Sequence, residues 1–266
     1  MRWPWIIFGL VALAMVLSLF LGGSRGTSLN IVGSTSIQPF AEMEAQEYQK
    51  AFPGRYVDVQ GGGSTAGLQA AANGLADIGT CSRGLKKDEE GQFRPVVIAR
   101  DGLAVVVHLG NPVENLTRQQ VRAIFMGSVT NWQDVGGQDA PIRLITREEG
   151  SGTREAFAHL VMEKARIAAT ALTQESNGAV KELVRNDPCA IGYMSLGLVG
   201  KELKILKVDG AAPSADTVRD GSYTLARPFL FVTKGAPSPD AQAFIDYVLS
   251  PPGRKLLEQE GLIAQP

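Results

Sequence analysis

One local pattern recurs along this chain of 266 residues: a short apolar stretch, then a turn rich in glycine and hydroxyl residues, then a helical pattern. It is clearest where Leu144 and Ile145 lead through Arg147 and the Gly-Ser-Gly-Thr turn at 150–153 into a helical run. Glycine permits backbone conformations that other residues resist, and serine or threonine can cap the first turn of a helix. Repeated strand–turn–helix units predict an α/β fold with many short connections.

The same turn has the chemistry of an anion site. The start of a helix carries about half a positive charge and several unpaired N–H groups, which suit an oxyanion. Arg147 would add a planar fork of donors that matches phosphate, carboxylate or sulfate. Taken alone, the turn fits a structural role equally well, in which Ser151 or Thr153 caps the helix and Arg147 is a solvated surface charge.

Three further turns decide between these two interpretations. Residues 33–40 follow the apolar stretch at 29–32, residues 61–68 follow an alternating strand pattern, and residues 77–83 end in Ser82 and Arg83. Any one of these turns is weak evidence, because glycine and serine are common in ordinary connections between strands and helices. Several in one chain predict that the turns converge on one small anion.

At these motifs the chain resembles the phosphate-binding proteins that feed ABC-type phosphate importers. The motifs that carry the resemblance lie at residues 33–39, 62–67, 77–79 with 82–83, and 147–153. It continues through residues 124–127, 130–132, 191–193, 220–223, 227–228 and 250–253, so it covers nearly everything after the N-terminal apolar stretch. The family has an α/β fold of the two-lobed periplasmic-binding-protein-like type (type II), with two hinge crossings and the ligand in the cleft.

The resemblance implies that residues 27–107 plus 228–266 form lobe I and that residues 108–227 form lobe II. Apolar runs at 95–99 and 102–107 predict buried strands, the second of which should leave lobe I, and a strand at 229–233 should return. The pattern also predicts helix at 165–184, with a break near 176–178, and a surface loop at 211–220.

The resemblance also implies a set of phosphate ligands on the matching turns. They are Thr35, Ser36, Ser64, Ser82, Arg147, Ser151, Gly152 and Thr153. Arg147 would be the principal charged clamp, and Arg83 is a weaker candidate whose alternative role is a surface salt bridge.

Ser82 occupies the position at which well-known family members carry aspartate. An ionised aspartate can only accept a hydrogen bond from phosphate, whereas serine can donate or accept, so we expect poorer rejection of sulfate than in those relatives. Glu148 and Glu149 are possible substitutes for the missing carboxylate, although we expect both to be solvated charges in the turn.

Residues 1–26 contain an apolar run from Trp5 to Gly23 that only Ser18 interrupts. The run is near the ~20 residues that cross a bilayer and longer than the usual ~7–15 of a cleavable signal core. We therefore expect a membrane anchor, with a signal peptide cleaved after the small residues Gly22-Gly23-Ser24 as the alternative. The folded part would lie outside the cytoplasm in either case, on the periplasmic or extracellular side.

Composition excludes several other classes of protein. Lys and Arg number 26 against 27 for Asp and Glu, so the chain lacks the basic excess typical of nucleic-acid binders. Two cysteines and two histidines indicate neither a disulfide framework nor a metal cluster, and we expect no cofactor. A P-loop motif is absent, and Gly-Gly-Ser-Thr-Ala at 62–66 has Ala66 where a serine-hydrolase turn requires glycine.

The sequence thus predicts a non-enzymatic, monomeric solute-binding protein that captures inorganic phosphate and delivers it to an ABC permease complex. Three alternatives remain open: a receptor for another tetrahedral oxyanion such as sulfate, an anchored phosphate sensor, and a serine hydrolase that uses Ser64.

Overall fold

The computed structural model describes residues 27–163 and 165–265. The expected N-terminal anchor or signal peptide at 1–26 lies outside the described residues. Within the described ranges, no helix is both long enough and apolar enough to cross a membrane.

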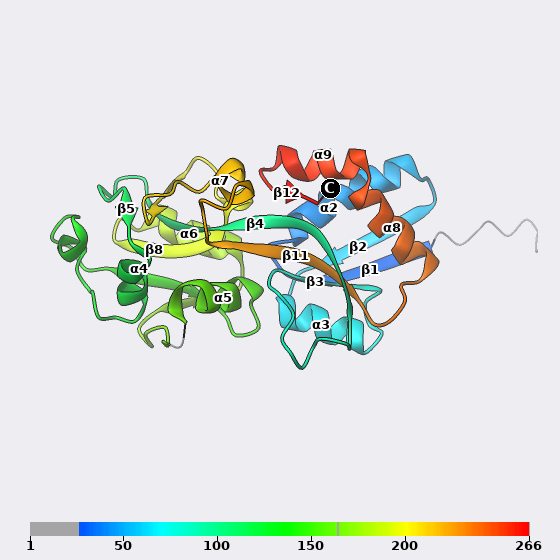
Figure 1. Cartoon of the computed structure of the whole chain (residues 1–266), viewed down its shortest axis with the longest axis horizontal. Helices are drawn as coiled ribbons and strands as arrows, with labels where there is room; N and C mark the ends of the chain where they lie inside the picture. The colour runs from blue at the N-terminus through cyan, green and yellow to red at the C-terminus, as the bar shows by residue number, and fades with distance from the viewer. Residues whose placement is uncertain (1–26, 164, 266) are drawn as a thin grey trace, which may run out of the picture.

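The chain forms two α/β lobes that lie end to end along the long axis of the molecule (Figure 1). Lobe I contains β1 (Thr27–Gly33), α2 (Gln38–Ala51), β2 (Arg55–Gln60), α3 (Ser64–Ala72), β3 (Ile78–Cys81), α8 (Pro239–Leu249), α9 (Pro251–Gln259) and β12 (Ile263–Ala264). Lobe II contains β5 (Asn115–Leu116), α4 (Arg118–Phe125), η1 (Trp132–Val135), β6 (Arg143–Arg147), α5 (Gly152–Phe157), η2 (Ala158–Met162), β7 (Leu172–Gln174), α6 (Asn177–Asn186), β8 (Ala190–Ser195), η3 (Leu196–Leu198), β9 (Leu203–Ile205), β10 (Lys207–Val208) and α7 (Ala215–Arg219).

Two long strands connect the lobes, β4 (Arg94–His108) and β11 (Ala226–Thr233). The main sheet has the order β2-β1-β3-β11-β4-β8-β6-β7 and runs through both lobes. The apolar runs predicted as separate strands at 95–99 and 102–107 are one strand, because antiparallel pairing with β11 continues across the residues between them. This register places Arg227 directly opposite Asp101.

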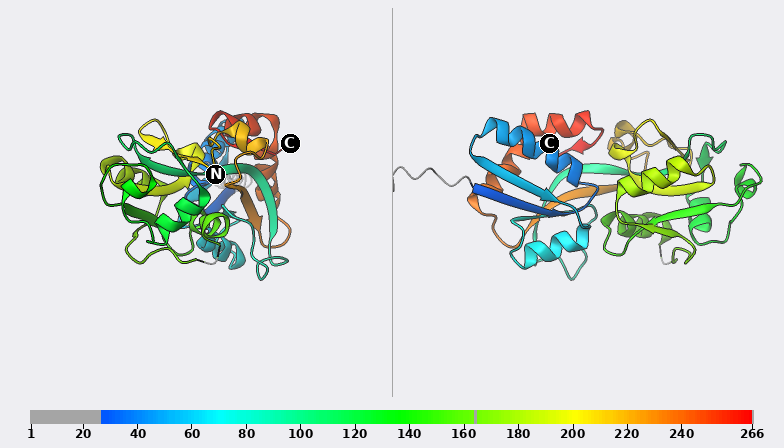
Figure 2. Two further views of the ribbon diagram at one scale, coloured as in Figure 1. Left: turned by 60° about the vertical axis from the view of Figure 1, so that its left-hand side comes forward. Right: turned by 180° about the vertical axis from the view of Figure 1, so that it is seen from behind.

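Each lobe has its own hydrophobic core on the two faces of the sheet. In lobe I, α2, α8 and α9 cover one face and α3 covers the other (Figures 1 and 2). β4 supplies both lobes, since Ile98 packs in a lobe I cluster and Leu103 in a lobe II cluster. The lobe boundaries at 107/108 and 227/228 stay predictions, because both crossings are continuous strands.

Two local predictions in lobe II are wrong. Residues 165–176 are not helical: β7 pairs with β6 there, and α6 begins only at Asn177, where the Ser176 side chain accepts a hydrogen bond from the Ala179 N–H. The predicted loop at 211–220 contains α7, which starts at a capping box formed by Ser214 and Thr217. Strand pairing thus overrides the helical pattern of residues 165–176, and a capping box starts a helix within the polar segment at 211–220.

Glu44 of α2 is a buried carboxyl group that generates a stability prediction. Its side chain is 1% exposed, and neither oxygen has a hydrogen-bond partner among the described residues. Burial, and secondarily the charge of Glu47, raises the pKa of Glu44 from 4.5 to about 8. The folded protein therefore holds this proton over a pH range in which the unfolded chain has released it.

We predict that the free energy of unfolding falls as pH rises from about 4.5 to 8, by up to ~1.4 kcal/mol per pH unit from this group. Glu44→Gln should remove this component and be most stabilising at the upper end of the range. Urea unfolding measured across the range checks this, with Glu42→Gln as the exposed control on the same helix. Parallel pH profiles for the wild type and Glu44→Gln would contradict the prediction.

Candidate functional site

The predicted turns meet at the boundary between the lobes. They follow β1, β2, β3 and β6, so the site lies beyond the carboxyl ends of these strands, as in other open α/β sheets. The Ser36 and Thr153 hydroxyl oxygens, from lobes I and II, are 2.8 Å apart. All eight predicted residues lie in this cluster or in direct contact with it, and all except Thr35 are buried.

Arg147 ends β6 at the centre of the cluster and is 1% exposed, so its interpretation as a solvated surface charge is wrong. Its Nε and NH2 atoms each donate to the Glu148 carboxylate at 2.9 Å, and NH2 also donates to Thr35 Oγ1 at 3.0 Å. Its NH1 atom is buried and has no hydrogen-bond partner among the described residues. The prediction that Glu148 is solvated is likewise wrong, because it pairs with Arg147, whereas Glu149 is exposed.

The start of α5 is built for close approach of the lobes. Ser151 caps the helix, its Oγ accepting from the Arg154 N–H at 3.3 Å. A side chain on Gly152 would place its Cβ 2.1 Å from Ser64 Oγ and 2.6 Å from Ser82 Oγ. Only glycine therefore fits at this position against the hydroxyls of lobe I.

Arg227 of β11 is a second buried guanidinium that sequence reasoning did not place in the site. Its NH1 donates to Thr153 Oγ1 at 2.8 Å and its NH2 donates to Ser36 Oγ at 3.1 Å, so one side chain contacts both lobes. Its Nε and NH2 atoms also donate to Asp101 Oδ2, at 3.1 and 2.9 Å. The signal in the sequence was a charge within an apolar strand, since such a charge is rarely buried unless it is paired.

Asp101 and Asn177 complete the cluster and were also missed. Asp101 is 1% exposed, and its Oδ1 accepts from the Ser195 hydroxyl at 3.0 Å. Burial raises the pKa of the Asp101 carboxyl and lowers the pKa of the Arg227 guanidinium, while their mutual attraction opposes both shifts. Asn177, in the first turn of α6, donates from Nδ2 to Ser36 Oγ at 3.0 Å.

The electrostatics of the cluster suit a small anion. Each guanidinium is paired with its own carboxylate, so each of the two ion pairs is formally neutral. Burial lowers the pKa of Arg227, and the charge of Arg147 contributes in the same direction. Hydroxyl, amide and guanidinium donors surround the same buried place, and an anion there would be held mainly by directed hydrogen bonds.

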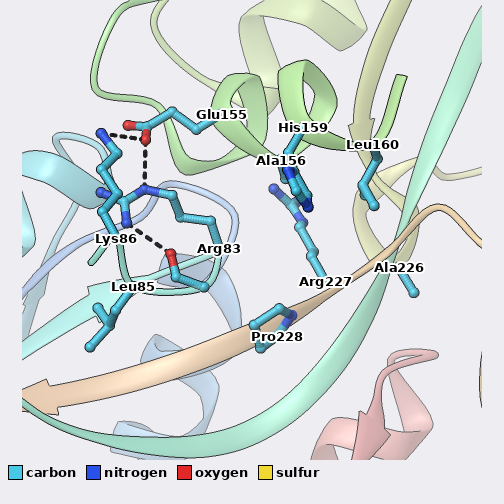
Figure 3. A pocket seen from close by; sticks show the side chains of 11 residues that line it. Arg83, Leu85, Lys86, Glu155, Ala156, His159, Leu160, Ala226, Arg227 and Pro228 are labelled. Atoms are coloured by element: carbon cyan, nitrogen blue, oxygen red, sulfur yellow. Dashed lines mark hydrogen bonds and ion pairs between the residues drawn. The ribbon is translucent and has the colours of Figure 1, made fainter. Parts of the chain in front are cut away.

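A separate pocket of about 390 Å³ lies beside this cluster and shares Arg227 with it (Figure 3). In it the Glu155 carboxylate pairs with Arg83 Nε at 2.9 Å and with Lys86 Nζ at 2.7 Å. Arg83 is buried and also pairs with Glu89, so the prediction of a surface salt bridge is wrong about its exposure. The hydroxyl and guanidinium cluster, not this pocket, is the candidate anion site, because the predicted turns meet there and the buried NH1 atom of Arg147 has no hydrogen-bond partner among the described residues.

The fold and this cluster agree with what the chain is similar to. A family model described as a PBP superfamily domain matches residues 22–252. The phosphate-binding protein PstS of Bacillus subtilis (strain 168) is 31% identical, over 84% of this chain and 75% of that protein, and PstS of Borreliella burgdorferi is 29% identical, over 88% and 89%.

Solved structures extend the similarity. A putative phosphate ABC transporter substrate-binding protein with bound phosphate from Clostridium perfringens is 38% identical with a TM-score of 0.88, covering 90% of this chain and 100% of that one. An ABC-type phosphate transport receptor from Vibrio cholerae is 38% identical with a TM-score of 0.75, covering 89% and 100%. The fold is therefore that of the two-lobed solute-binding proteins. The chain belongs to the PBP superfamily and, within it, to the PstS family.

The buried ion pair generates a stability prediction. Asp101→Asn leaves the Arg227 charge buried without its counter-ion, and we expect the free energy of unfolding to fall by ~3–5 kcal/mol. The control is Asp216→Asn, which breaks an exposed pair with Arg219 and should cost at most ~1 kcal/mol. Chemical unfolding of both variants measures the difference, and equal small effects would show that the pair does not hold the crossing strands together.

Proposed function

We propose that this protein captures inorganic phosphate between its lobes, outside the cytoplasm, and delivers it to an ABC permease complex in the membrane. The observation that carries the proposal is Arg147, whose guanidinium is buried where the predicted turns meet and keeps its NH1 atom without a partner among the described residues. The names of the relatives, and the bound phosphate in the Clostridium perfringens protein, support phosphate as the anion.

In this proposal Arg147 is the charged clamp and the turns supply neutral donors. Thr35, Ser36, Ser64 and Ser82 would serve from lobe I, and Ser151, Gly152 and Thr153 from lobe II. Arg227 joins them as a positioning residue, because it holds Ser36 and Thr153 and is itself neutralised by Asp101. Phosphate would thus be dehydrated between two lobes that each contribute part of the site.

We infer delivery to a permease from the family, and an extracytoplasmic location from the family and the N-terminal apolar run. Similar proteins are described as substrate-binding proteins of phosphate ABC transporters. We propose a monomer that works with a membrane permease. A phosphate sensor anchored in the membrane would share the site but have no permease partner, so copurification with a permease distinguishes the two functions.

We also propose that the protein is not an enzyme. Ser64, the candidate nucleophile, accepts from the Ser82 N–H at 3.0 Å and lies 3.4 Å from the Ser82 hydroxyl. Among the described hydrogen bonds, neither histidine contacts it, so no base is positioned to activate this serine. Turnover of an ester or a phosphate monoester that Ser64→Ala abolishes would contradict this proposal.

Removing the clamp should weaken binding without unfolding the protein. Arg147→Ala loses a charge-assisted contact with a dehydrated anion, and we expect at least ~10-fold weaker phosphate affinity by calorimetry. Arg143→Ala is the matched control, because Arg143 lies on the same strand with its side chain 57% exposed. Unchanged phosphate binding in Arg147→Ala would remove this residue from the site.

Phosphate should also draw the lobes together. Ligand-binding groups come from both lobes, and β4 and β11 are the two strands that cross between them, so closed molecules bind more tightly than open ones. We expect the radius of gyration in small-angle scattering to decrease when phosphate is saturating. Identical scattering curves with and without phosphate would indicate that the lobes do not move.

A further inference from the structure

We propose that the hydrogen-bond polarity of this site is fixed, with Arg227 and Asn177 forcing its hydroxyl groups to act as donors, so that the site favours a tetrahedral dianion, which carries at most one proton, over a monoanion. The inference rests on the proposed function and adds the protonation state of the ligand. The direction of each hydrogen bond can be assigned, because guanidinium, amide NH2 and backbone N–H groups only donate and carboxylates only accept.

The orientation of the Asn177 amide is determined by its neighbours. The Ser195 N–H, which can only donate, lies 3.1 Å from Asn177 Oδ1. The amide oxygen therefore faces Ser195, and the NH2 group faces the hydroxyls of lobe I. Its Nδ2 atom lies 3.0 Å from Ser36 Oγ and 3.5 Å from Thr35 Oγ1.

These donors determine the direction of the hydroxyl pair that joins the lobes. Ser36 Oγ receives N–H groups from Asn177 and from Arg227, so both of its lone pairs are used and its own hydrogen must be donated. Its remaining neighbour is Thr153 Oγ1 at 2.8 Å. Thr153 Oγ1 then accepts hydrogen bonds from the Ser36 hydroxyl and from Arg227 NH1, so its own hydrogen remains available to donate to an anion.

The same reasoning applies to Thr35 and Ser82. Thr35 Oγ1 accepts a hydrogen bond from Arg147 NH2 at 3.0 Å and a longer one from Asn177 Nδ2 at 3.5 Å, so its own hydrogen remains available to donate. Ser82 Oγ accepts a hydrogen bond from the Ser34 hydroxyl at 2.8 Å and a long one from Arg227 NH1 at 3.5 Å. The hydroxyl at the position where other family members carry aspartate therefore also donates, either to an anion or to Ser64 Oγ at 3.4 Å.

The two carboxylates beside the site do not replace that aspartate. Asp101 Oδ2 accepts twice from Arg227, and Oδ1 accepts from Ser195. Glu148 lies on the edge of the Arg147 guanidinium formed by Nε and NH2, whereas the unpartnered NH1 atom is at the other side of that group. Each proton on a bound anion would therefore meet donors, so the phosphate dianion, with one proton, fits the site better than the monoanion, with two.

The contacts described above place charged protein groups beside the site. The charged groups are Asp101, Glu148, Arg147, Arg227 and Arg154, the last of which donates to the Arg147 carbonyl oxygen at 2.9 Å. Burial raises the pKa of Tyr193 and of the Cys81 thiol, so both stay protonated. Sulfate carries no proton to lose in this range, so a change of phosphate affinity with pH that sulfate affinity does not share reports the protonation of phosphate itself.

The first test uses the unmodified protein. Phosphate affinity, measured by calorimetry, should increase about tenfold from near pH 6 to near pH 8, as the dianion replaces the monoanion. Sulfate, which carries no proton in this range, should bind and compete with phosphate. Affinity that is independent of pH, together with no competition by sulfate, would overturn the inference and leave the proposed function intact.

The second test reverses the hydroxyl pair. Asn177→Asp replaces the donor to Ser36 with an acceptor, so Ser36 can donate to the new carboxylate, Thr153 can donate to Ser36, and one lone pair of Thr153 becomes free for a protonated oxygen. We expect the ratio of phosphate affinity to sulfate affinity to rise about tenfold, and the pH dependence to flatten. The control, Asn186→Asp, adds the same charge at the exposed end of α6 and should leave the ratio unchanged.

The outcomes separate the two proposals. Equal affinity ratios in Asn177→Asp and Asn186→Asp would overturn the role of Asn177, with thermal unfolding showing that both variants are folded. The wild type could also reject sulfate, and Glu148→Gln could abolish this rejection. That result would identify Glu148 as an acceptor and also overturn the inference. Binding of sulfate but not phosphate would contradict the proposed function while supporting the donor-only site.

Discussion

The buried ion pair between Asp101 and Arg227 is the interaction on which the rest of the site depends. It joins directly opposed residues of β4 and β11, the two strands that connect the lobes. Removing two charges from water is costly, and the pairing offsets this cost only when their remaining hydrogen bonds are satisfied. Here they are, because Asp101 also accepts from Ser195 and Arg227 also donates to Ser36 and Thr153. The connection between the lobes and the orientation of the hydroxyls in the proposed anion site therefore share one structural element.

In this site, the anion would be recognised by hydrogen bonds, not by a net positive charge. Both guanidinium groups are neutralised locally, Arg147 by Glu148 and Arg227 by Asp101. An anion would consequently enter a place with little net charge and be held by hydrogen bonds whose directions are fixed. Such hydrogen bonds distinguish ligands by where they can accept and donate, whereas net positive charge would attract many anions alike.

Contact between the lobes depends on small residues as much as on polar ones. The absence of a side chain at Gly152 allows α5 to approach Ser64 and Ser82, and the Thr65 N–H donates to the Gly150 carbonyl oxygen at 3.1 Å. Glu155 of the same helix pairs across the boundary with Arg83 and Lys86 (Figure 3). These contacts lie beside the proposed anion site, so closure of the lobes and dehydration of the ligand are expected to occur together.

The sequence by itself determined the α/β fold, the turns and the central position of Arg147. These features are local: a strand end, a glycine and hydroxyl turn and a helix start lie within about ten residues of one another, and their chemistry follows from residue type. It did not determine the roles of Asp101, Asn177 and Arg227, nor the start of α6 at Asn177, where strand pairing by β7 replaced the predicted helix. The hydrogen bond from Arg227 to Ser36 spans 191 residues of the chain, and the bond from Arg227 to Asp101 spans 126. Partners this distant are chosen by the register of β4 against β11 and by the meeting of the lobes, so only the tertiary structure decided which hydroxyls donate.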